Sequence, residues 1–388
     1  MDFAFSDEEQ AFRTELRAFL EVELPDWWRG MFVDDERAIP LTREICRKLA
    51  ERGWLTMAWP PEHGGRGASP WMQTILREEM WAHEEPRGPQ YMNLNYIGPL
   101  LMRFGTAEQQ ARFLPPMARG EVIWCQGFSE PDAGSDLASL RTRAFDRGDH
   151  IVVNGRKIWT SYADAPAQWC LVLVRTDPDA PKHDGISVLL VDMETPGITV
   201  RPIGTMAGPH EFNEVSFDDV VVPRSHLLGE RDHGWDVIVT GLTFERVGIA
   251  RYARAGAVLE RIVEHANETG LAADLRVRQQ LAELRARHEV ARLLAYRAVS
   301  RQAAGEVPTV EASIARIHAT LLEQEVGHVG LELLGPVGLL RAADQWTSLR
   351  GEIHRQWVRN IPTTVAAGTL EVQKDVVAHR GLGLPRAR

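Results

Sequence analysis

The sequence predicts an α+β fold with a helical N-terminal domain, a central domain of short strands and a C-terminal helical bundle domain. Apolar residues recur at helical spacing over residues 1–122, and short strand-like runs replace them over 123–230. Long helical patterns return over 231–388. A chain of 388 residues is also long enough for two or three domains.

The N-terminal part is predicted to be helical. Ser6-Asp7-Glu8-Glu9 has the form of a capping box, which is typical of a helix start. Behind it, Phe12, Leu16, Phe19 and Leu20 recur at helical spacing. Residues 41–52 and 71–85 carry further helical patterns, whereas the breaker-rich residues 59–67 predict a loop.

The central part is predicted to consist of short strands. Asn154-Gly155 lies between two apolar runs, and this dipeptide favours the type I′ turn of a β-hairpin. Further strands are predicted at 169–174, 186–191, 214–217 and 220–222, and together they indicate a small barrel or sandwich. In the C-terminal part, helices are predicted at 235–268, 272–304 and 309–334 and in a final segment, forming an antiparallel bundle.

Composition argues against several functions. The net charge of −10 disfavours binding to nucleic acid or to an anionic membrane surface. The N-terminus lacks a signal-peptide pattern and no apolar run approaches membrane-spanning length, so a cytoplasmic location is expected. The three cysteines, Cys46, Cys125 and Cys170, are widely separated, which argues against a disulfide framework or zinc ribbon and predicts buried thiols.

Several common cofactor motifs are absent. The sequence has no Gly-x-Gly-x-x-Gly after a strand, no P-loop and no Gly-x-Ser-x-Gly element. It also lacks a His-x-x-x-His pair with an adjacent acid, so no metal site is predicted. These observations leave a cofactor bound outside a Rossmann unit, or no cofactor.

Five short motifs carry a resemblance to a known family. Gln126–Asp136 contains Glu-Pro-x-Ala-Gly-Ser-Asp, which taken alone is equally typical of a polar turn. The other four motifs are Asn154-Gly155-x-Lys157-x-Trp159-x-Ser161, Pro61-Glu62-x-Gly64-Gly65, Phe217-Asp218-Asp219-Val220-x-Val222-Pro223 and Gly368-Thr369-x-Glu371-x-Gln373. In this order the motifs resemble the acyl-CoA dehydrogenase family over essentially the whole chain. The resemblance implies that family's fold, with an N-terminal helical domain, a central β-barrel and a C-terminal four-helix bundle. The run His210–Val215 is similar to bacterial members that degrade steroid side chains.

The resemblance implies FAD as cofactor. Family members place two loops around the isoalloxazine ring, where hydrogen-bond donors stabilise the charge that arrives with the hydride. The residues implied there are Gln126, Phe128, Ser129, Gly134, Ser135, Trp159 and Ser161. Thr369 and Glu371 would contact the dinucleotide portion, and Glu332 and Gly335 would belong to a partner subunit's FAD site. The chain departs from the family pattern in having Glu332, where many members carry Gln, and in lacking Arg-x-x-Phe-Gly near Thr269–Arg276.

The catalytic base is predicted at Glu245. Many members place the base directly before the Gly-Thr of the last motif, but this chain has Ala367 there. Glu245 matches the family's alternative position and would begin an apolar helical stripe, in which desolvation favours a basic carboxylate. The stripe continues through Ile249, Tyr252, Gly256, Leu259 and Val263. The structural alternative is a glutamate in the first turn of a helix that pairs with an arginine. Substrate contacts are expected from Ser135, Arg246, Ala367 and Gly368.

The resemblance implies α,β-dehydrogenation of an acyl-CoA thioester to the 2-enoyl-CoA, with an electron-transfer flavoprotein as electron acceptor. It implies a homo-oligomer, either a dimer or a tetramer, or a heterotetramer with a homologous subunit. Two alternatives remain. The same fold supports other flavin chemistry, such as that of an oxidase, hydroxylase or desulfinase, and the chain could be the non-catalytic subunit of a heteromer.

Overall fold

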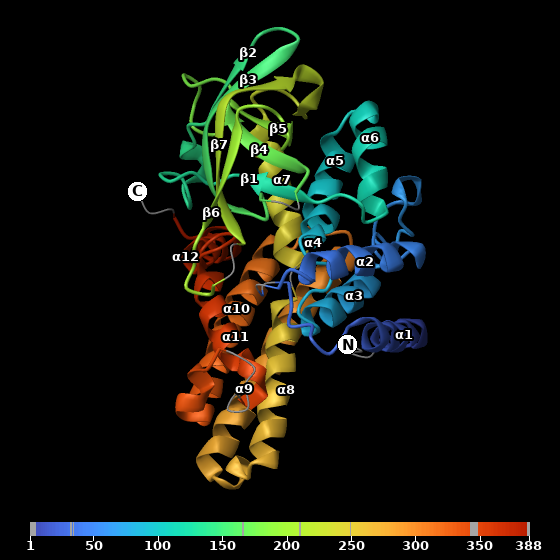
Figure 1. The fold of residues 1–388 in the computed structure, drawn as a ribbon, viewed down its shortest axis with the longest axis vertical. Helices are drawn as coiled ribbons and strands as arrows, with labels where there is room; N and C mark the ends of the chain where they lie inside the picture. Colours follow the sequence, from blue (N-terminus) through green and yellow to red (C-terminus); the bar gives the residue numbers. More distant parts are fainter. Residues whose placement is uncertain are drawn as a thin grey trace. The chain divides into compact units, whose positions relative to one another are not determined.

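The computed structural model describes residues 5–31, 33, 35–164, 167–208, 211–248, 250–341 and 348–385, excluding the side chains of 242–248, 348 and 350. The chain forms two compact units (Figure 1). The sheet unit comprises Gly30–Ala68 and Pro86–Glu245, and the helical unit comprises Met1–Arg29, Ser69–Glu85 and Arg246–Arg388. The two compact units do not follow the domain boundaries predicted near residues 122 and 230. The three-domain division remains a prediction.

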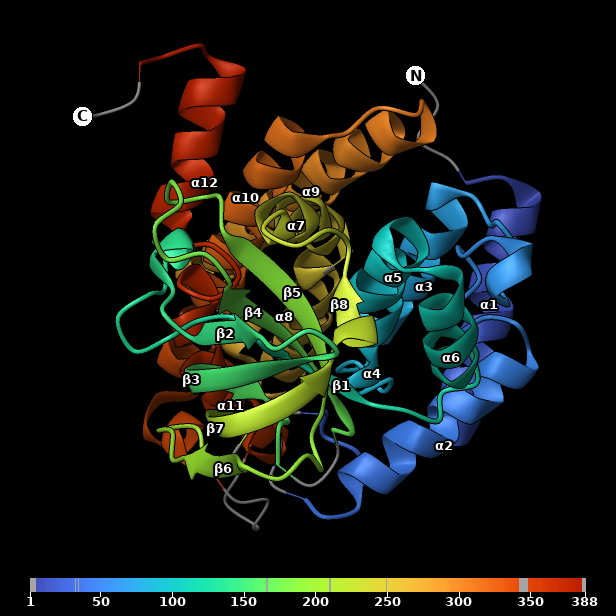
Figure 2. The same cartoon turned by 90° about the horizontal axis from the view of Figure 1, so that it is seen from above.

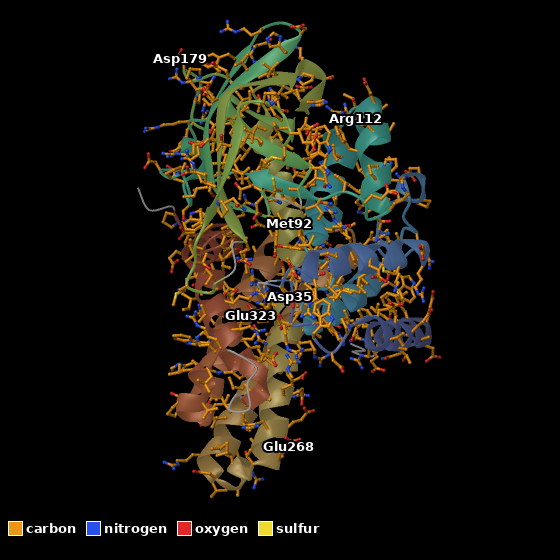
Figure 3. The ribbon with its side chains drawn as sticks, in the orientation of Figure 1. Asp35, Met92, Arg112, Asp179, Glu268 and Glu323 are labelled. Carbon is orange, nitrogen blue, oxygen red and sulfur yellow. The ribbon has the colours of Figure 1, made fainter. Side chains whose placement is uncertain are left out.

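The helical unit contains α1 (Asp7–Glu23), α3 (Pro70–Ala82), α8 (Arg251–Glu268), α9 (Leu275–Ala303), α10 (Thr309–Leu334), α11 (Glu352–Asn360) and α12 (Leu370–Val376). The capping box that starts α1 is confirmed, because the Ser6 hydroxyl accepts from the Glu9 N–H at 3.3 Å and the Glu9 carboxylate accepts from the Ser6 N–H at 2.9 Å. In this unit α10 packs against α8, α9, α11 and α12. Figure 3 places Glu323 on α10.

The sheet unit contains the helices α2 (Ala38–Glu51), α4 (Gln90–Met92), α5 (Gly98–Phe104) and α6 (Ala107–Ala118), together with most of α7 (Gly234–Gly248). Its strands are β1 (Trp124–Gly127), β2 (Arg143–Asp146), β3 (His150–Ser161), β4 (Trp169–Arg175), β5 (Ile186–Asp192), β6 (Ile198–Ile203), β7 (Phe212–Pro223) and β8 (Leu227–Leu228). The strands form one sheet in the order β6-β7-β3-β2-β4-β5-β8, with β1 paired to β4 in parallel (Figure 2).

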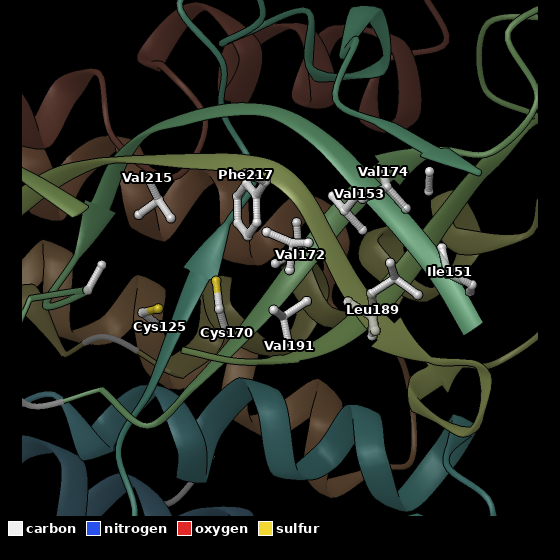
Figure 4. Close-up of a cluster of buried hydrophobic side chains, with 14 residues drawn as sticks. Cys125, Ile151, Val153, Cys170, Val172, Val174, Leu189, Val191, Val215 and Phe217 are labelled. Carbon is white, nitrogen blue, oxygen red and sulfur yellow. The ribbon is translucent and has the colours of Figure 1, made fainter. Parts of the chain in front are cut away.

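The core of the sheet unit is a cluster of buried apolar side chains, most of them on β3, β4, β5 and β7 (Figure 4). Cys125 and Cys170 lie opposite each other on β1 and β4 and belong to this cluster. All three cysteines are buried free thiols, as predicted. Among the described residues, no helix is long and apolar enough to cross a bilayer.

The predicted hairpin at Asn154-Gly155 is wrong, because both residues lie inside the single long strand β3. The Asn154 side chain donates to the Asp219 carboxylate and accepts from the Asp219 N–H, both at 2.9 Å, so it is fixed to β7. Gly155 has a φ of 152°, and a Cβ added to it would lie 2.6 Å from the Thr142 Cα. The glycine therefore allows a β-bulge and a close approach of the chain. The two strands predicted at 214–217 and 220–222 are likewise one strand, β7, whose pairing with β3 is interrupted by a bulge between Val153 and Gly155.

The single helix predicted at 235–268 is also wrong, because it divides into α7 (Gly234–Gly248) and α8. Gly248 favours a helix end, and Ala250 has non-helical backbone angles of φ −83° and ψ 58°. Ile249 lies outside the described residues. Glu245 consequently lies in the last turn of α7 and does not begin a continuous helical stripe.

Candidate active site

The loop that follows β1 is anchored by a buried ion pair. The Lys157 ammonium on β3 donates to the Glu130 carboxylate at 2.8 Å and to the Phe128 carbonyl at 3.0 Å. The Glu130 carboxylate also accepts from the N–H groups of Arg141 and Thr142, at 2.7 and 2.8 Å. One buried lysine thus holds two points of the loop that carries the first motif.

Burial and charge act in opposite directions on this pair. Burial lowers the pKa of Lys157 to about 8, and the Glu130 carboxylate limits the decrease. Burial alone would raise the pKa of Glu130, but Lys157 and the hydrogen bonds that the carboxylate accepts lower it overall. Both groups are charged at neutral pH, and their hydrogen bonds give the loop a fixed shape.

Trp159 presents its ring to the surface from an unusual backbone position. Its φ is 61°, and it lies in an irregularity of the β3–β7 pairing between Lys157 and Thr160. Such a bulge redirects a side chain away from the regular alternation of a strand. The ring is 56% exposed and meets the Phe212 ring edge-on at 6.0 Å. The ring therefore offers a flat, accessible apolar face.

The loop after β1 is tied to β3 and also exposes part of its backbone. The Ser129 carbonyl accepts from the Ile158 N–H at 2.9 Å, which ties the loop to the strand that carries Trp159 and Ser161. A Cβ added to Gly134 would meet nothing within 4 Å, and Gly134 and Ser135 are exposed, so their backbone is open to a ligand. A flat ring face beside hydroxyl and backbone donors fits an isoalloxazine ring, which has an apolar face and a polar edge.

Gln126 and Phe128 flank the buried Gly127. Both side chains are half-buried, and the Phe128 ring contacts the Tyr96 ring at 6.0 Å. The structure thus gathers all seven predicted flavin-end residues on β1, its following loop and the end of β3.

In the helical unit, residues 366–369 form a short strap ahead of α12, and this strap includes the start of the last motif. Ala367 and Gly368 have positive φ angles of 52° and 87°, and the Thr369 hydroxyl caps α12 by accepting from the Val372 N–H at 3.2 Å. The guanidinium of Arg316 donates to the Ala366 carbonyl. The strap is therefore fixed at both ends, while Glu371 is exposed in the first turn of α12.

Glu332 and Gly335 lie at the C-terminal end of α10. Glu332 is exposed, and Gly335 ends the helix with a φ of 58°. Arg316, which holds the strap, precedes Glu332 by sixteen residues on the same helix, a distance of about 24 Å. The two groups of predicted FAD residues on this unit are therefore well separated within one chain.

The predicted base and its neighbour lie at the end of α7. The structure places the backbone of Glu245 and Arg246 in the last turn of this helix, and their side chains lie outside the described residues. At a helix C-terminus the backbone dipole disfavours negative charge, in contrast to the first-turn position of the structural alternative.

Sequence reasoning assigned no role to three sets of polar residues. Glu130 and Lys157 belong to quoted motifs, and a lysine in the apolar phase of a strand was the signal that could have identified the pair. Arg251 and Arg254 share the Glu323 carboxylate in the core of the helical unit. Their only sequence signal is charge on an otherwise apolar helix face. Arg316 has no distinguishing signal, since its partner is a backbone carbonyl.

Three family profiles match the chain in order. Residues 6–121 match "Acyl-CoA dehydrogenase, N-terminal domain", residues 125–220 the middle domain and residues 232–382 the C-terminal domain. Together with the solved structures below, these matches confirm the predicted fold class of helical N-terminal, central sheet and C-terminal helical parts.

Individual relatives are similar over nearly the full length. Acyl-CoA dehydrogenase IpdE1 of Mycobacterium tuberculosis is 35% identical, covering 91% of this chain and 90% of the relative. Mouse mitochondrial short-chain specific acyl-CoA dehydrogenase is 31% identical, covering 95% and 89%. Among solved structures, the Tcur3481-Tcur3483 steroid ACAD has a TM-score of 0.92 and the ChsE4-ChsE5 complex from Mycobacterium tuberculosis 0.89, each at 34% identity with 100% of both chains covered. The predicted likeness to bacterial steroid-degradation members is confirmed.

Proposed function

Because this chain belongs to the acyl-CoA dehydrogenase family of flavin-dependent oxidoreductases, we propose that it dehydrogenates an acyl-CoA thioester to the 2-enoyl-CoA with FAD as cofactor. The observation that supports this proposal is the loop anchored by Lys157. Lys157 lies on the same strand as Trp159, whose ring is exposed. Together they provide a flat face and a donor-rich edge that suit the reactive ring of a flavin.

Each predicted residue of the sheet unit has a role in this function. Trp159 stacks on the ring system, and Ser129 and Ser161 donate hydrogen bonds to its polar edge. The backbone around Gln126, Phe128 and Gly134 completes that edge, and Ser135 contacts both cofactor and substrate. When bound, FAD accepts the hydride from the substrate β-carbon. Thr369 and Glu371 contact the dinucleotide portion.

Glu245 is the proposed base. Its carboxylate removes the α-proton of the thioester, and Arg246 beside it contacts the substrate. The C-terminal position in α7 supports this role, because a site that disfavours negative charge makes a carboxylate a better proton acceptor. Ala367 carries no proton-accepting group, so its backbone N–H serves to polarise the thioester carbonyl, next to Gly368.

The active form is proposed to be an oligomer in which Glu332 and Gly335 complete a partner subunit's FAD site. Their separation of about 24 Å from the Arg316 strap contact supports this assignment, because the strap residues serve the chain's own site. Exposed apolar side chains on the helical unit are suited to an interface, among them Leu339 and Ile361. The similar Tcur3481-Tcur3483 and ChsE4-ChsE5 structures each combine two different chains, which supports a heteromer with a homologous subunit. The proposed electron acceptor is an electron-transfer flavoprotein.

The test is an anaerobic screen of purified, FAD-loaded protein against a panel of acyl-CoA thioesters. Bleaching of the flavin absorbance and formation of the matching 2-enoyl-CoA are expected. The same reaction under air, followed by product and peroxide analysis, distinguishes the dehydrogenase from an oxidase or a hydroxylase. A protein that stays colourless after FAD reconstitution, and acquires flavin only with a homologous chain, would identify a subunit without an independent site.

A further inference from the structure

The aromatic ring of Tyr96 contacts two elements of the sheet unit, helix α7 and the loop after β1. On α7, Gly241 lies against this ring, and a Cβ added to Gly241 would be 2.5 Å from the Tyr96 Cε2 and 2.8 Å from its Cζ. The Tyr96 ring also contacts the Phe128 ring, with 6.0 Å between the two centroids. Tyr96 is only 2% exposed, so its ring is packed inside this unit.

The missing side chain at Gly241 is what allows the helix to approach the ring. Carbon atoms in contact normally lie about 3.5 Å or more apart, so any larger residue at this position would force the ring or the helix to move. The Leu100 side chain closes the same space, because its Cδ1 would be 2.9 Å from the added Cβ. Glycine lowers the stability of a helix relative to alanine. The close approach of Tyr96 therefore explains why α7 has a glycine here.

The segment that carries Tyr96 is itself fixed. Tyr96 lies in the π-helical turn Asn93–Ile97, which joins α4 to α5. The Asn93 side chain donates to the Val122 carbonyl at 2.6 Å and accepts from the Trp124 N–H at 3.1 Å. These two hydrogen bonds attach the turn to the start of β1. The ring of Tyr96 is thus presented from a firmly held backbone.

Both elements that the ring contacts belong to the proposed active site. Gly241 precedes the proposed base Glu245 by four residues, so the two positions lie about one turn apart on the same face of α7. Phe128 lies in the proposed flavin loop, and its carbonyl accepts from the Lys157 ammonium at 3.0 Å. The Gly241 backbone, the Tyr96 ring and the Phe128 ring therefore form a row of contacts from the helix of the proposed base to the flavin loop.

We propose that Tyr96 and Gly241 are positioning residues, which set the distance between the last turn of α7 and the flavin loop. The inference rests on the proposed function and deepens it. The reaction requires the base and the flavin to meet neighbouring carbons of one substrate, and a displacement of about 1 Å costs up to roughly a hundredfold in rate. Neither residue reacts itself, and the pair acts through the spacing of the groups that do.

The test is Gly241→Ala, which adds one methyl group against the Tyr96 ring. Alanine favours a helix more than glycine does, so a lower unfolding temperature would report the steric overlap. In FAD-loaded protein, the anaerobic bleaching rate with the most reactive acyl-CoA of the screen should fall about tenfold or more. The dissociation constant, obtained from the concentration dependence of that rate, should change by a smaller factor. The visible circular dichroism of the bound flavin should change as well.

Gly204→Ala is the matched control in the same unit. A Cβ added to Gly204 would meet nothing within 4 Å, and this residue is exposed, so the bleaching rate and circular dichroism should stay as in the wild type.

A second variant removes the ring atoms that the new methyl group would meet. Tyr96→Leu alone should also slow bleaching, because the helix and the loop lose the ring that separates them. Adding Gly241→Ala to Tyr96→Leu should bring the bleaching rate and the circular dichroism back toward the wild type, since the methyl group occupies part of the vacated space. This comparison decides the question even if Gly241→Ala alone does not fold.

Wild-type bleaching and circular dichroism in Gly241→Ala would overturn the proposal, and so would a further loss of rate in the double variant. A loss of rate matched by an equal weakening of acyl-CoA binding would indicate a substrate contact and would overturn it too. If no acyl-CoA bleaches the wild-type flavin, the proposed function fails. The circular dichroism and thermal unfolding of the variants would still decide whether these two residues set the spacing.

Discussion

The Lys157 ammonium and the Glu130 carboxylate contact each other at 2.8 Å inside the sheet unit, and Lys157 also binds the Phe128 carbonyl. This pair links the middle of β3 to the loop after β1. Because both motifs of the proposed flavin site depend on this link, the pair is expected to control how firmly the cofactor is held.

Replacing Lys157 by Met should weaken FAD binding and destabilise the fold. The substitution leaves the buried Glu130 carboxylate without its counter-ion, and breaking such a pair costs about 3–5 kcal/mol. FAD retention on gel filtration and thermal unfolding measure the two effects. Lys182→Met is the control, because Lys182 is half-exposed and pairs with the exposed Asp136. Equal FAD retention by the two variants would contradict the prediction.

FAD retention should also fall as the pH rises through about 8. Lys157 is charged below that pH and loses a proton above it, which weakens its hold on the loop. Global stability should respond to this group in the opposite direction. The unfolded chain keeps the lysine proton to about pH 10.5, so loss of the proton from the folded state at about 8 makes unfolding less favourable as the pH rises between these values. Dissociation constants for FAD measured from pH 7 to 9 test the prediction, and a constant affinity would refute it.

Glu245→Gln should abolish most turnover while preserving the binding of acyl-CoA. Glutamine keeps the shape of the side chain but accepts no proton, and removal of a general base costs roughly a hundredfold or more in rate. The anaerobic bleaching rate with a substrate of the wild type is the measurement. Glu268→Gln, at the exposed end of α8, is the control. Near-normal bleaching of Glu245→Gln would shift the assignment to another acid. Ala367→Glu is not expected to rescue it fully.

Trp159→Ala should lower the affinity for FAD without unfolding the protein. The ring is more than half exposed in the chain, so its removal creates no core cavity. Loss of stacking of about 0.5–1.5 kcal/mol corresponds to a roughly two- to tenfold weaker affinity. Titration of FAD fluorescence measures the affinity, and Trp159→Phe should retain more of it. An affinity for FAD unchanged in Trp159→Ala would exclude the ring from the site.

Leu339→Glu should dissociate the proposed oligomer and release FAD with it. Leu339 is 57% exposed and follows Gly335, so a charge there would oppose burial at an interface. Sedimentation velocity with absorbance detection of flavin reports both effects. Val22→Glu, at a highly exposed position of α1, should leave the assembly intact. A stable, FAD-loaded monomer of the wild type would disprove the shared cofactor site.

The sequence predicted features whose cause is local. The capping box at Ser6 and the extents of α9 and α10 follow from nearby residues, and the structure agrees with them. The error at Asn154-Gly155 has a distant cause: the side chain of Asn154 bonds Asp219, sixty-five residues away. Likewise, no local pattern reveals that Arg251 and Arg254 share Glu323 on another helix. The sequence therefore identified the loops that carry family motifs, but it did not reveal the buried hydrogen bonds and ion pairs that hold the fold in place.

The guanidinium of Arg316 on α10 donates to the Ala366 carbonyl at the start of the strap. The backbone next to Ala367 is therefore held by a side chain that lies fifty residues earlier in the sequence. A substitution that shifts α10 would move this backbone without touching any of the five family motifs. The rate of the proposed reaction is thus expected to report on the packing of the helical unit as well as on its reacting groups.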